Sequence, residues 1–320
     1  MSLLVLGGGG AVGSAIVRRA AAAGLDVHAV LRPSTDPIRL DPCHTVVTIH
    51  RLDIADTARL TEVVEQVRPR HVVAAAFPAH PATGWDADQR GATAGAVIGN
   101  LLSTSEALRS AGGDVRFVLL GSLMVYGRGG RSRHPDHPTR PQTFRGALKA
   151  AESALAFQFA EETGTEFVEL RLGSVYGPFQ PRRRLITELM RTALLGERLR
   201  VVAEPVLRDW IHFDDVAGAC LVATDAKRSR SPLVAHVASG EVHSLRDIVS
   251  IAERVVGRPL AHDEPSKAID RYGDVEPALL APPEEFDWRP TVTLDDGIAE
   301  YWDWARSPIG RHYLLDGAVR

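Results

Sequence analysis

The chain has 320 residues, enough for about two domains, and its 45% hydrophobic and 24% charged residues argue against disorder. Its 37 basic and 40 acidic residues give a net charge of -3, which provides no electrostatic reason to expect binding to nucleic acid or to an acidic membrane surface. No apolar run approaches the ~20 residues that span a bilayer, so we expect no membrane partner. Cys43 and Cys220 lie far apart and no secretory signal precedes the first apolar run, so we expect a cytoplasmic location.

The first half of the chain alternates short apolar runs with helical stretches, which is the pattern of βαβ units and predicts a parallel sheet. The predicted strands are 3–6, 27–31, 46–52, 71–76, 115–122 and 166–173. The predicted helices between them begin at Ala11 and cover 57–67, 93–111 and 146–163. After "VYGP" (175–178) the texture changes: we expect a helix over 182–197, a strand at "RDWIHF" (208–213), and a helix after Asp214, whose carboxylate would cap it.

A glycine loop joins the first strand to the first helix. In "GGGGAVG", Gly7, Gly10 and Gly13 have the spacing GxxGxxG. Glycine allows a sharp turn there, and without a Cβ the backbone lets a pyrophosphate approach the positive end of the helix. The alternative use of such glycines is close helix packing, but their place between strand and helix favours a dinucleotide site.

The end of the second strand indicates which dinucleotide is bound. An acidic residue there favours NAD through the ribose 2′-hydroxyl, whereas an arginine accommodates the 2′-phosphate of NADP. In "VHAVLRPST" Leu31 stands where an acid would be and Arg32 follows. We therefore expect NADP(H) to be preferred, with NAD(H) as the alternative. If Arg32 is instead only a solvated arginine of the loop, it carries no information about the cofactor.

Further motifs follow in order along nearly the whole chain: "LDIADTARL" (52–60), "VVAAAF" (72–77), "SLMVYG" (122–127), "LRLGSVYGP" (170–178), "RDWIHFDDVA" (208–217) and "DWRPTVTLDDGI" (287–298). With the glycine loop, they resemble the extended short-chain dehydrogenase/reductase family of NAD-dependent epimerases and dehydratases, particularly those acting on nucleotide sugars. The resemblance implies that Asp53, Ile54 and Ala76 contact the cofactor.

The same resemblance implies an α/β fold: a Rossmann-type doubly wound parallel sheet with a smaller C-terminal substrate-binding domain. The dinucleotide-binding domain would take residues 1–174, with 206–237 returning to it. The substrate-binding domain would take 175–205 and 238–320.

The catalytic residues that the resemblance implies are incomplete. Ser122 matches the residue that orients the substrate oxygen, and Lys149 matches the lysine that holds the nicotinamide ribose. The tyrosine that should stand four residues before that lysine is replaced by Arg145. An arginine has a pKa above ~12 and is a poor proton donor, although its charge can stabilise a developing alkoxide.

Other residues offer only weak substitutes for the missing tyrosine. Tyr126 and Tyr176 carry phenols, and His134 and His137 carry imidazoles, the side chain that most often serves as a general acid or base. The HxxH spacing of the two histidines lacks a third ligand, so we expect no metal.

On the substrate side, the resemblance implies that Arg208 contacts the diphosphate of a nucleoside-diphosphate sugar, as the planar fork of a guanidinium can. Ser174 stands where the family often has an asparagine that contacts the substrate phosphates. In the loop before the third helix, Trp85 could stack on substrate. The family's dimers pair the helices expected at 93–111 and 146–163, so we expect a homodimer.

The sequence thus favours an NADP(H)-dependent enzyme that modifies a sugar nucleotide, as a 4-ketoreductase, epimerase or dehydratase, with a non-standard proton donor. Two alternatives stay open. One is a catalytically silent NADP-binding sensor or scaffold, which the loss of the tyrosine favours. The other is a ketoreductase that acts on another small ketone.

Overall fold

The computed structural model of the protein describes residues 2–78, 86–112, 114–127, 134–182, 184–200, 207–225, 232–263 and 286–315. Trp85, one of the residues considered for the substrate side, lies outside them. Within the described parts of the chain, no helix is long and apolar enough to cross a membrane.

A seven-stranded sheet forms the centre of the molecule, with the strand order β3-β2-β1-β4-β5-β6-β9. All of its neighbouring strands pair in parallel. The chain starts at β1, winds outward to β3, and then returns to β4 on the other side of β1, so this is the doubly wound Rossmann-type order. The strands are β1 (Ser2–Leu6), β2 (Asp26–Leu31), β3 (Val47–Arg51), β4 (His71–Ala74), β5 (Arg116–Ser122), β6 (Glu166–Leu172) and β9 (Leu233–Val237).

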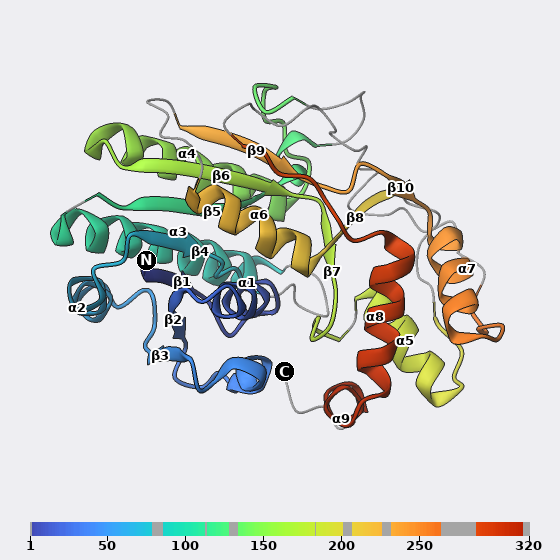
Figure 1. Cartoon of the computed structure of the whole chain (residues 1–320). Coiled ribbons are helices and arrows are strands. Elements are labelled where there is room, and N and C mark those ends of the chain that lie inside the picture. Colours follow the sequence, from blue (N-terminus) through green and yellow to red (C-terminus); the bar gives the residue numbers. More distant parts are fainter. Residues whose placement is uncertain are drawn as a thin grey trace.

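Helices cover both faces of this sheet (Figure 1). α1 (Ala11–Ala22) and α6 (Phe213–Asp225) pack on one face, and their apolar residues share a buried core with β1, β2 and β6. α2 (Thr57–Val67), α3 (Ala87–Ala111) and α4 (Phe144–Thr163) pack on the other face, around a second core with Phe117 at its centre. Both faces are buried, which explains why the strands read as continuous apolar runs.

The predicted elements agree with the structure except at particular points. α3 begins at Ala87, six residues before the predicted start, because Asp86 accepts a hydrogen bond from Gln89 N and caps it. α6 begins at Phe213, so Asp214 lies in its first turn and is not its cap. β9 was not predicted, and it pairs with β6 through its register Leu170↔Ala235.

The remaining elements form a smaller unit beside the carboxyl edge of the sheet (Figure 1). A three-stranded sheet in the order β10-β8-β7 leads into it, and four helices share its hydrophobic core around Tyr176 and Tyr301. Its elements are β7 (Ser174–Tyr176), α5 (Leu185–Leu195), β8 (Arg208–His212), β10 (Val242–His243), α7 (Leu245–Val256), α8 (Leu294–Arg306) and α9 (Pro308–Leu315). The division of the chain into domains at 174/175, 205/206 and 237/238 stays a prediction.

Candidate functional site

The glycine loop turns tightly between β1 and α1. Gly7 has φ +81°, which favours glycine, and the amides of Gly7 and Gly8 both donate to Val30 O at 3.1 Å. A Cβ on Gly7 would lie 2.8 Å from the Cα of Ala76, on the neighbouring strand end. The predicted cofactor residues Gly7 and Ala76 are therefore in direct contact.

The start of α1 is open to an anion. Gly10 is the N-cap, and its amide donates to Gly7 O at 2.9 Å. It has no side-chain oxygen to occupy the amides of the first turn, which have no partner inside the helix. A Cβ on Gly13 would collide with Gly7 O, so the third glycine is required for packing. This bare, positively polarised helix end fits the pyrophosphate of a dinucleotide.

At the end of β2 no carboxylate takes the place that reads a ribose. Leu31 is buried, Arg32 is exposed, and the first acidic residue, Asp36, caps the short 3₁₀ helix η1 (Pro37–Cys43) by accepting from Ile38 N at 2.9 Å. The loop is fixed from the next strand, because Arg51 donates to the carbonyl oxygens of Pro33 and Thr35. Arg32 is therefore the exposed charged residue that directly follows the strand.

The predicted adenine-contacting pair follows β3. Asp53 is exposed and accepts from Ala55 N at 3.0 Å, whereas Ile54 is only 5% exposed and packs into the core on the α2 side. Their contact with a cofactor stays a prediction.

Ser122 and Lys149 lie together at the carboxyl edge of the sheet. Ser122 is the last residue of β5, and its Oγ accepts from Met124 N at 3.2 Å, which leaves its own hydrogen available to donate. Lys149 lies on α4 and donates through Nζ to Leu120 O, also on β5, at 2.7 Å. The helix can come this close because Gly146 has no Cβ; an added Cβ would lie 2.6 Å from Met124 O.

Two cations share one aromatic ring at this edge. The guanidinium carbon of Arg145 lies 4.3 Å and Lys149 Nζ 4.4 Å from the centre of the Phe77 ring, which follows β4. Both distances are within the range of cation–π attraction. Arg145 thus lies beside Lys149, in the part of the site where the missing tyrosine was expected.

Lys149 is buried, at 6% exposure, and forms an ion pair with Glu152 Oε2 at 2.7 Å. Burial is the largest influence on the pKa of Lys149 and lowers it, Glu152 raises it, and the charge of Arg145 lowers it further. The net effect lowers the pKa of Lys149, and Glu152, one helical turn after it, offsets part of the effect of burial.

The two candidate tyrosines are buried away from any open site. Tyr126 is 2% exposed, and its hydroxyl bonds His236 Nε2 at 2.8 Å and Arg171 Nη1 at 2.5 Å. Tyr176 is 1% exposed, and burial raises the pKa of both phenols. Their burial and hydrogen bonds are those of core tyrosines, and a role for either as the acid stays a prediction.

The two histidines of the proline-rich loop bind each other locally. His134 N donates to His137 Nδ1 at 3.1 Å, and His134 lies 3.0 Å from the exposed carboxylate of Asp136. Their contacts are those of a surface turn.

The predicted substrate residues lie on adjacent strands. Ser174 starts β7 and pairs with Trp210 of β8, and Arg208 starts β8 and pairs with His243 of β10. Asp209, the residue after Arg208 on β8, is fully buried and accepts from Ser239 N, Ser239 Oγ and Gly240 N at 2.7–2.9 Å. This carboxylate fixes the strand that carries Arg208.

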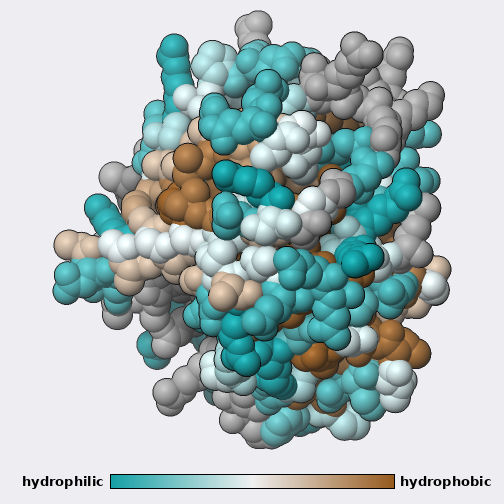
Figure 2. Space-filling model, turned by 90° about the vertical axis from the view of Figure 1, so that its left-hand side faces the viewer, coloured by the Kyte–Doolittle hydropathy of each residue, from teal (hydrophilic) through white to brown (hydrophobic). Residues whose placement is uncertain are grey.

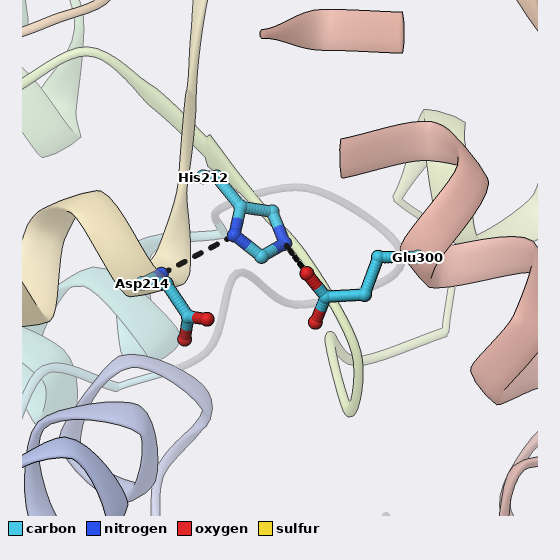
Figure 3. Close-up of side chains that lie close together, drawn as sticks. All are labelled: His212, Asp214 and Glu300. Atoms are coloured by element: carbon cyan, nitrogen blue, oxygen red, sulfur yellow. Dashed lines mark hydrogen bonds and ion pairs between the residues drawn. The ribbon is translucent and has the colours of Figure 1, made fainter. Parts of the chain in front are cut away.

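A cluster of one histidine and two carboxylates lies between α6, which packs on the central sheet, and α8 of the smaller unit. His212, Asp214 and Glu300 approach one another from β8, α6 and α8 (Figure 3). His212 is 1% exposed, its Nδ1 accepts from Asp214 N at 3.3 Å, and its Nε2 points toward Glu300 at 3.9 Å with no hydrogen-bond partner among the described residues.

The hydrogen bonding of His212 does not suit a metal ligand. A metal-bound imidazole donates its second N–H to an acceptor, whereas Nδ1 of His212 already accepts from a backbone amide, so Nε2 carries the hydrogen in the neutral ring. A cation is also supplied by Arg18 of α1: burial lowers its pKa, and the charges of Asp214 and Glu300 raise it.

Sequence reasoning missed Phe77 and Glu152. Glu152 follows Lys149 by one turn, so the i,i+3 spacing was a usable signal. Phe77 belongs to "VVAAAF", but nothing in the sequence relates it to Arg145, which is 68 positions further along the chain.

Comparison with known proteins agrees with this geometry. The family model described as "NAD dependent epimerase/dehydratase family" matches residues 3–238. The chain is 27% identical to dTDP-6-deoxy-L-talose 4-dehydrogenase (NAD(P)(+)) of Kitasatospora kifunensis over 93% of each chain. It is 24% identical to dTDP-glucose 4,6-dehydratase of Salmonella typhimurium, over 95% of this chain and 92% of that one.

Solved structures show the same fold. UDP-glucose 4-epimerase of Thermus thermophilus, in complex with NAD, matches with a TM-score of 0.83 and 26% identity, over 96% of this chain and 100% of that one. UDP-glucose 4-epimerase of Bifidobacterium longum, in complex with NAD+ and UDP, matches with a TM-score of 0.84 and 18% identity, over 97% and 100%. The family match covers the glycine loop, Ser122, Lys149 and Arg208. The chain therefore belongs to the NAD dependent epimerase/dehydratase family.

Proposed function

We propose that this protein is an NADP(H)-dependent enzyme that reduces, epimerises or dehydrates the sugar of a nucleoside diphosphate, without the tyrosine on which the family's proton transfer depends. The observation that carries the proposal is the group at the carboxyl edge of the sheet: Ser122 with a hydrogen to donate, and Lys149 and Arg145 on one ring. A bound nicotinamide would supply or accept the hydride.

The chain's own residues have separate roles in this proposal. Ser122 donates its hydroxyl hydrogen to the reacting sugar oxygen. Lys149 holds the nicotinamide ribose, and Glu152 balances its charge. Arg145 stays protonated and stabilises the negative charge that develops on the oxygen. Because Glu152 balances the charge of Lys149, the guanidinium of Arg145 supplies the net positive charge at this edge. In reduction it lowers the energy of an alkoxide that then takes its proton from water, and in the oxidation that begins an epimerisation or dehydration the hydroxyl releases its proton to water.

The cofactor preference rests on the end of β2. With Leu31 buried and Asp36 occupied as a helix cap, Arg32 is the charged group that follows the strand. The family description names NAD, and the Kitasatospora relative is named for NAD(P)(+), so both dinucleotides should be titrated. We expect tighter binding of NADPH than of NADH, and Arg32→Ala should remove that difference; equal affinities for the wild type would contradict the preference.

The substrate class rests on β7 and β8. Ser174 and Arg208 start adjacent strands, and the buried Asp209 fixes the second of them. The relatives named above act on dTDP or UDP sugars, which supports a diphosphate at Arg208. A panel of dTDP and UDP sugars, tested with NADPH and with NADP+, examines both the substrate and the direction.

We further propose a homodimer formed by α3 and α4. Figure 2 shows hydrophobic residues gathered on a face that is otherwise largely hydrophilic. On α3, Leu102 is 55% exposed, and on α4, Leu155 is 39% exposed. The outer side of α3 also carries glycine at every fourth residue, Gly91, Gly95 and Gly99, with nothing within 4 Å of an added Cβ. Helical glycine costs about 1 kcal/mol relative to alanine, and a partner helix packed closely against this stripe would offset that cost.

One observation favours the silent alternative. Lys149 is buried and its ammonium already contacts Leu120 O and Glu152. If the protein binds dinucleotide tightly and still leaves NADPH absorbance unchanged with every sugar nucleotide of the panel, the enzyme proposal fails and the sensor or scaffold role replaces it.

A further inference from the structure

A buried arginine joins the glycine loop to the C-terminal part of the chain. Arg39 lies on η1, between β2 and β3, and is 6% exposed. Its guanidinium donates in three directions, to a carbonyl of the glycine loop and to two groups of the smaller unit. None of the motifs that identify the family includes this residue.

The contact with the glycine loop fixes one peptide group at both ends. Arg39 Nη1 donates to Gly9 O at 3.0 Å, and the N–H of the same peptide, on Gly10, donates to Gly7 O at 2.9 Å. This peptide leads directly into the first turn of α1, where the pyrophosphate is expected. The orientation of the phosphate-binding amides therefore depends on a hydrogen bond from Arg39.

The other two contacts reach across to the smaller unit. Arg39 Nε donates to Phe179 O at 3.3 Å, and Nη2 donates to the Tyr313 hydroxyl of α9 at 2.6 Å. That hydroxyl donates in turn to Phe179 O at 2.8 Å. Phe179 has φ +65°, a backbone conformation that a phenylalanine keeps only where surrounding contacts fix it.

A second arginine, Arg18, donates a hydrogen bond to the backbone of Arg39. Arg18 of α1 donates through Nη1 to Arg39 O at 2.8 Å, and its guanidinium lies 5.4 Å from the centre of the Phe179 ring. The helix that begins at the glycine loop is thus also tied to Arg39 and Phe179.

We propose that Arg39 is a positioning residue for the dinucleotide. Tyr313 and Phe179 hold its guanidinium, which in turn holds the Gly9–Gly10 peptide in its phosphate-binding orientation. The affinity for the cofactor therefore depends on α9. This inference rests on the proposed dinucleotide binding. Because coupling is reciprocal, bound dinucleotide stabilises the contact between η1 and α9 by the same factor.

The test compares two buried tyrosines of the same core. Tyr313→Phe removes the hydroxyl that joins Arg39 to Phe179, whereas Tyr301→Phe removes a hydroxyl whose hydrogen-bond partner among the described residues is Thr187, at 2.9 Å. Both lose one buried hydroxyl and should lower the melting temperature similarly. We expect Tyr313→Phe to raise the Kd of NADPH about fivefold, because it removes a hydrogen bond that holds the Arg39 guanidinium, and Arg39→Lys to raise it about tenfold or more, because it removes the guanidinium that donates to Gly9 O.

Tyr301→Phe should leave the Kd within about twofold of the wild type. Equal changes in Kd for Tyr313→Phe and Tyr301→Phe would overturn the inference. If the wild type binds neither NADPH nor NADH, the proposed function fails, and hydrogen exchange of the free protein decides the inference alone. Tyr313→Phe must then speed exchange in residues 7–13 while Tyr301→Phe does not, and equal exchange would overturn it.

Discussion

At the scale of single residues, the replacement of a phenol by Arg145 changes which chemistry the site can perform. The guanidinium is held 4.3 Å from the Phe77 ring, beside Lys149 on the same ring. It keeps its proton at any working pH, so it contributes charge and not a proton. In the proposed function, this charge would stabilise an alkoxide without neutralising it at once.

Arg145→Tyr tests this role directly. If Arg145 stabilises the developing charge, the substitution should lower kcat by about a hundredfold, as the loss of a preorganised oxyanion donor does. Arg145→Lys keeps the charge and should lose less. A rise in turnover on Arg145→Tyr, measured with the sugar nucleotide that the wild type uses, would mean that a standard tyrosine relay has simply been lost.

The pair of Lys149 and Glu152 gives a second prediction at this scale. Lys149→Met leaves Glu152 buried without its cation, which should lower the free energy of unfolding by about 3–5 kcal/mol. The double variant Lys149→Met/Glu152→Gln should recover a large part of that loss. Urea denaturation of the four proteins of this cycle measures the coupling, and strictly additive losses would show that the pair has no such role.

At the scale of secondary-structure elements, the sequence predicted the strands and helices that its periodicity marks. The apolar runs that became β1, β4, β5 and β6 are largely buried, whereas the edge strand β3 exposes Thr48 and Arg51. Helix periodicity identified α1, α2 and α4 to within a few residues. β9 was missed because "LVAHV" is short and partly polar, and it is a strand only because β6 offers it an edge. The earlier start of α3 depends on a cap by Asp86 that lies before any apolar pattern.

The candidate site was predictable to the extent that it consists of motifs. Gly7, Gly10 and Gly13 were predicted from their spacing, and Ser122 and Lys149 from the family resemblance. The structure brings Gly7 to Ala76 and Lys149 to β5. Phe77 and Arg39 were not predicted, because each acts through neighbours that only folding brings close. Contacts over more than a hundred residues, such as Arg39 with Tyr313, leave no local pattern in a sequence.

The glycine stripe of α3 gives a test of the proposed dimer. Gly95→Leu places a large side chain where another helix would pack, and in the single chain that position is open. We expect a monomeric mass by light scattering, with a monomer that folds as well as the wild type, because leucine favours helix over glycine by about 0.8 kcal/mol. Glu65→Leu, at an exposed position of α2, is the control and should stay dimeric. A dimeric Gly95→Leu variant would exclude this face as the interface.

At the scale of the whole molecule, the fold holds buried histidines that resist protonation. His71, at the start of β4, is 8% exposed and its Nδ1 has no hydrogen-bond partner among the described residues. Burial first, and then the charges of Arg116 and Arg70, lower the pKa of His71 to about 4. The unfolded chain protonates the same side chain near pH 6.5, so between these values the unfolded state binds more protons, and stability falls as the pH falls through this window.

The consequence is measurable as a difference between two proteins. From pH 7 to pH 5, His71 should cost the wild type about 2 kcal/mol of unfolding free energy. His71→Leu removes this titration, so its stability should fall by that much less over the same interval. Urea denaturation at both pH values tests this, and parallel losses in the two proteins would show that His71 is protonated equally in the folded and unfolded states.

The glycine loop follows β1, Ser122 ends β5, and Ser174 follows β6, so these residues lie at the carboxyl edge of the central sheet, as the proposed function requires. The most direct measurement is the change in NADPH absorbance when the purified protein is mixed with a panel of dTDP and UDP 4-keto sugars. We expect oxidation of NADPH with at least one of them, lost in the folded Lys149→Met/Glu152→Gln variant. Unchanged absorbance across the whole panel, and no conversion of the corresponding sugars with NADP+ or NAD+, would contradict the account.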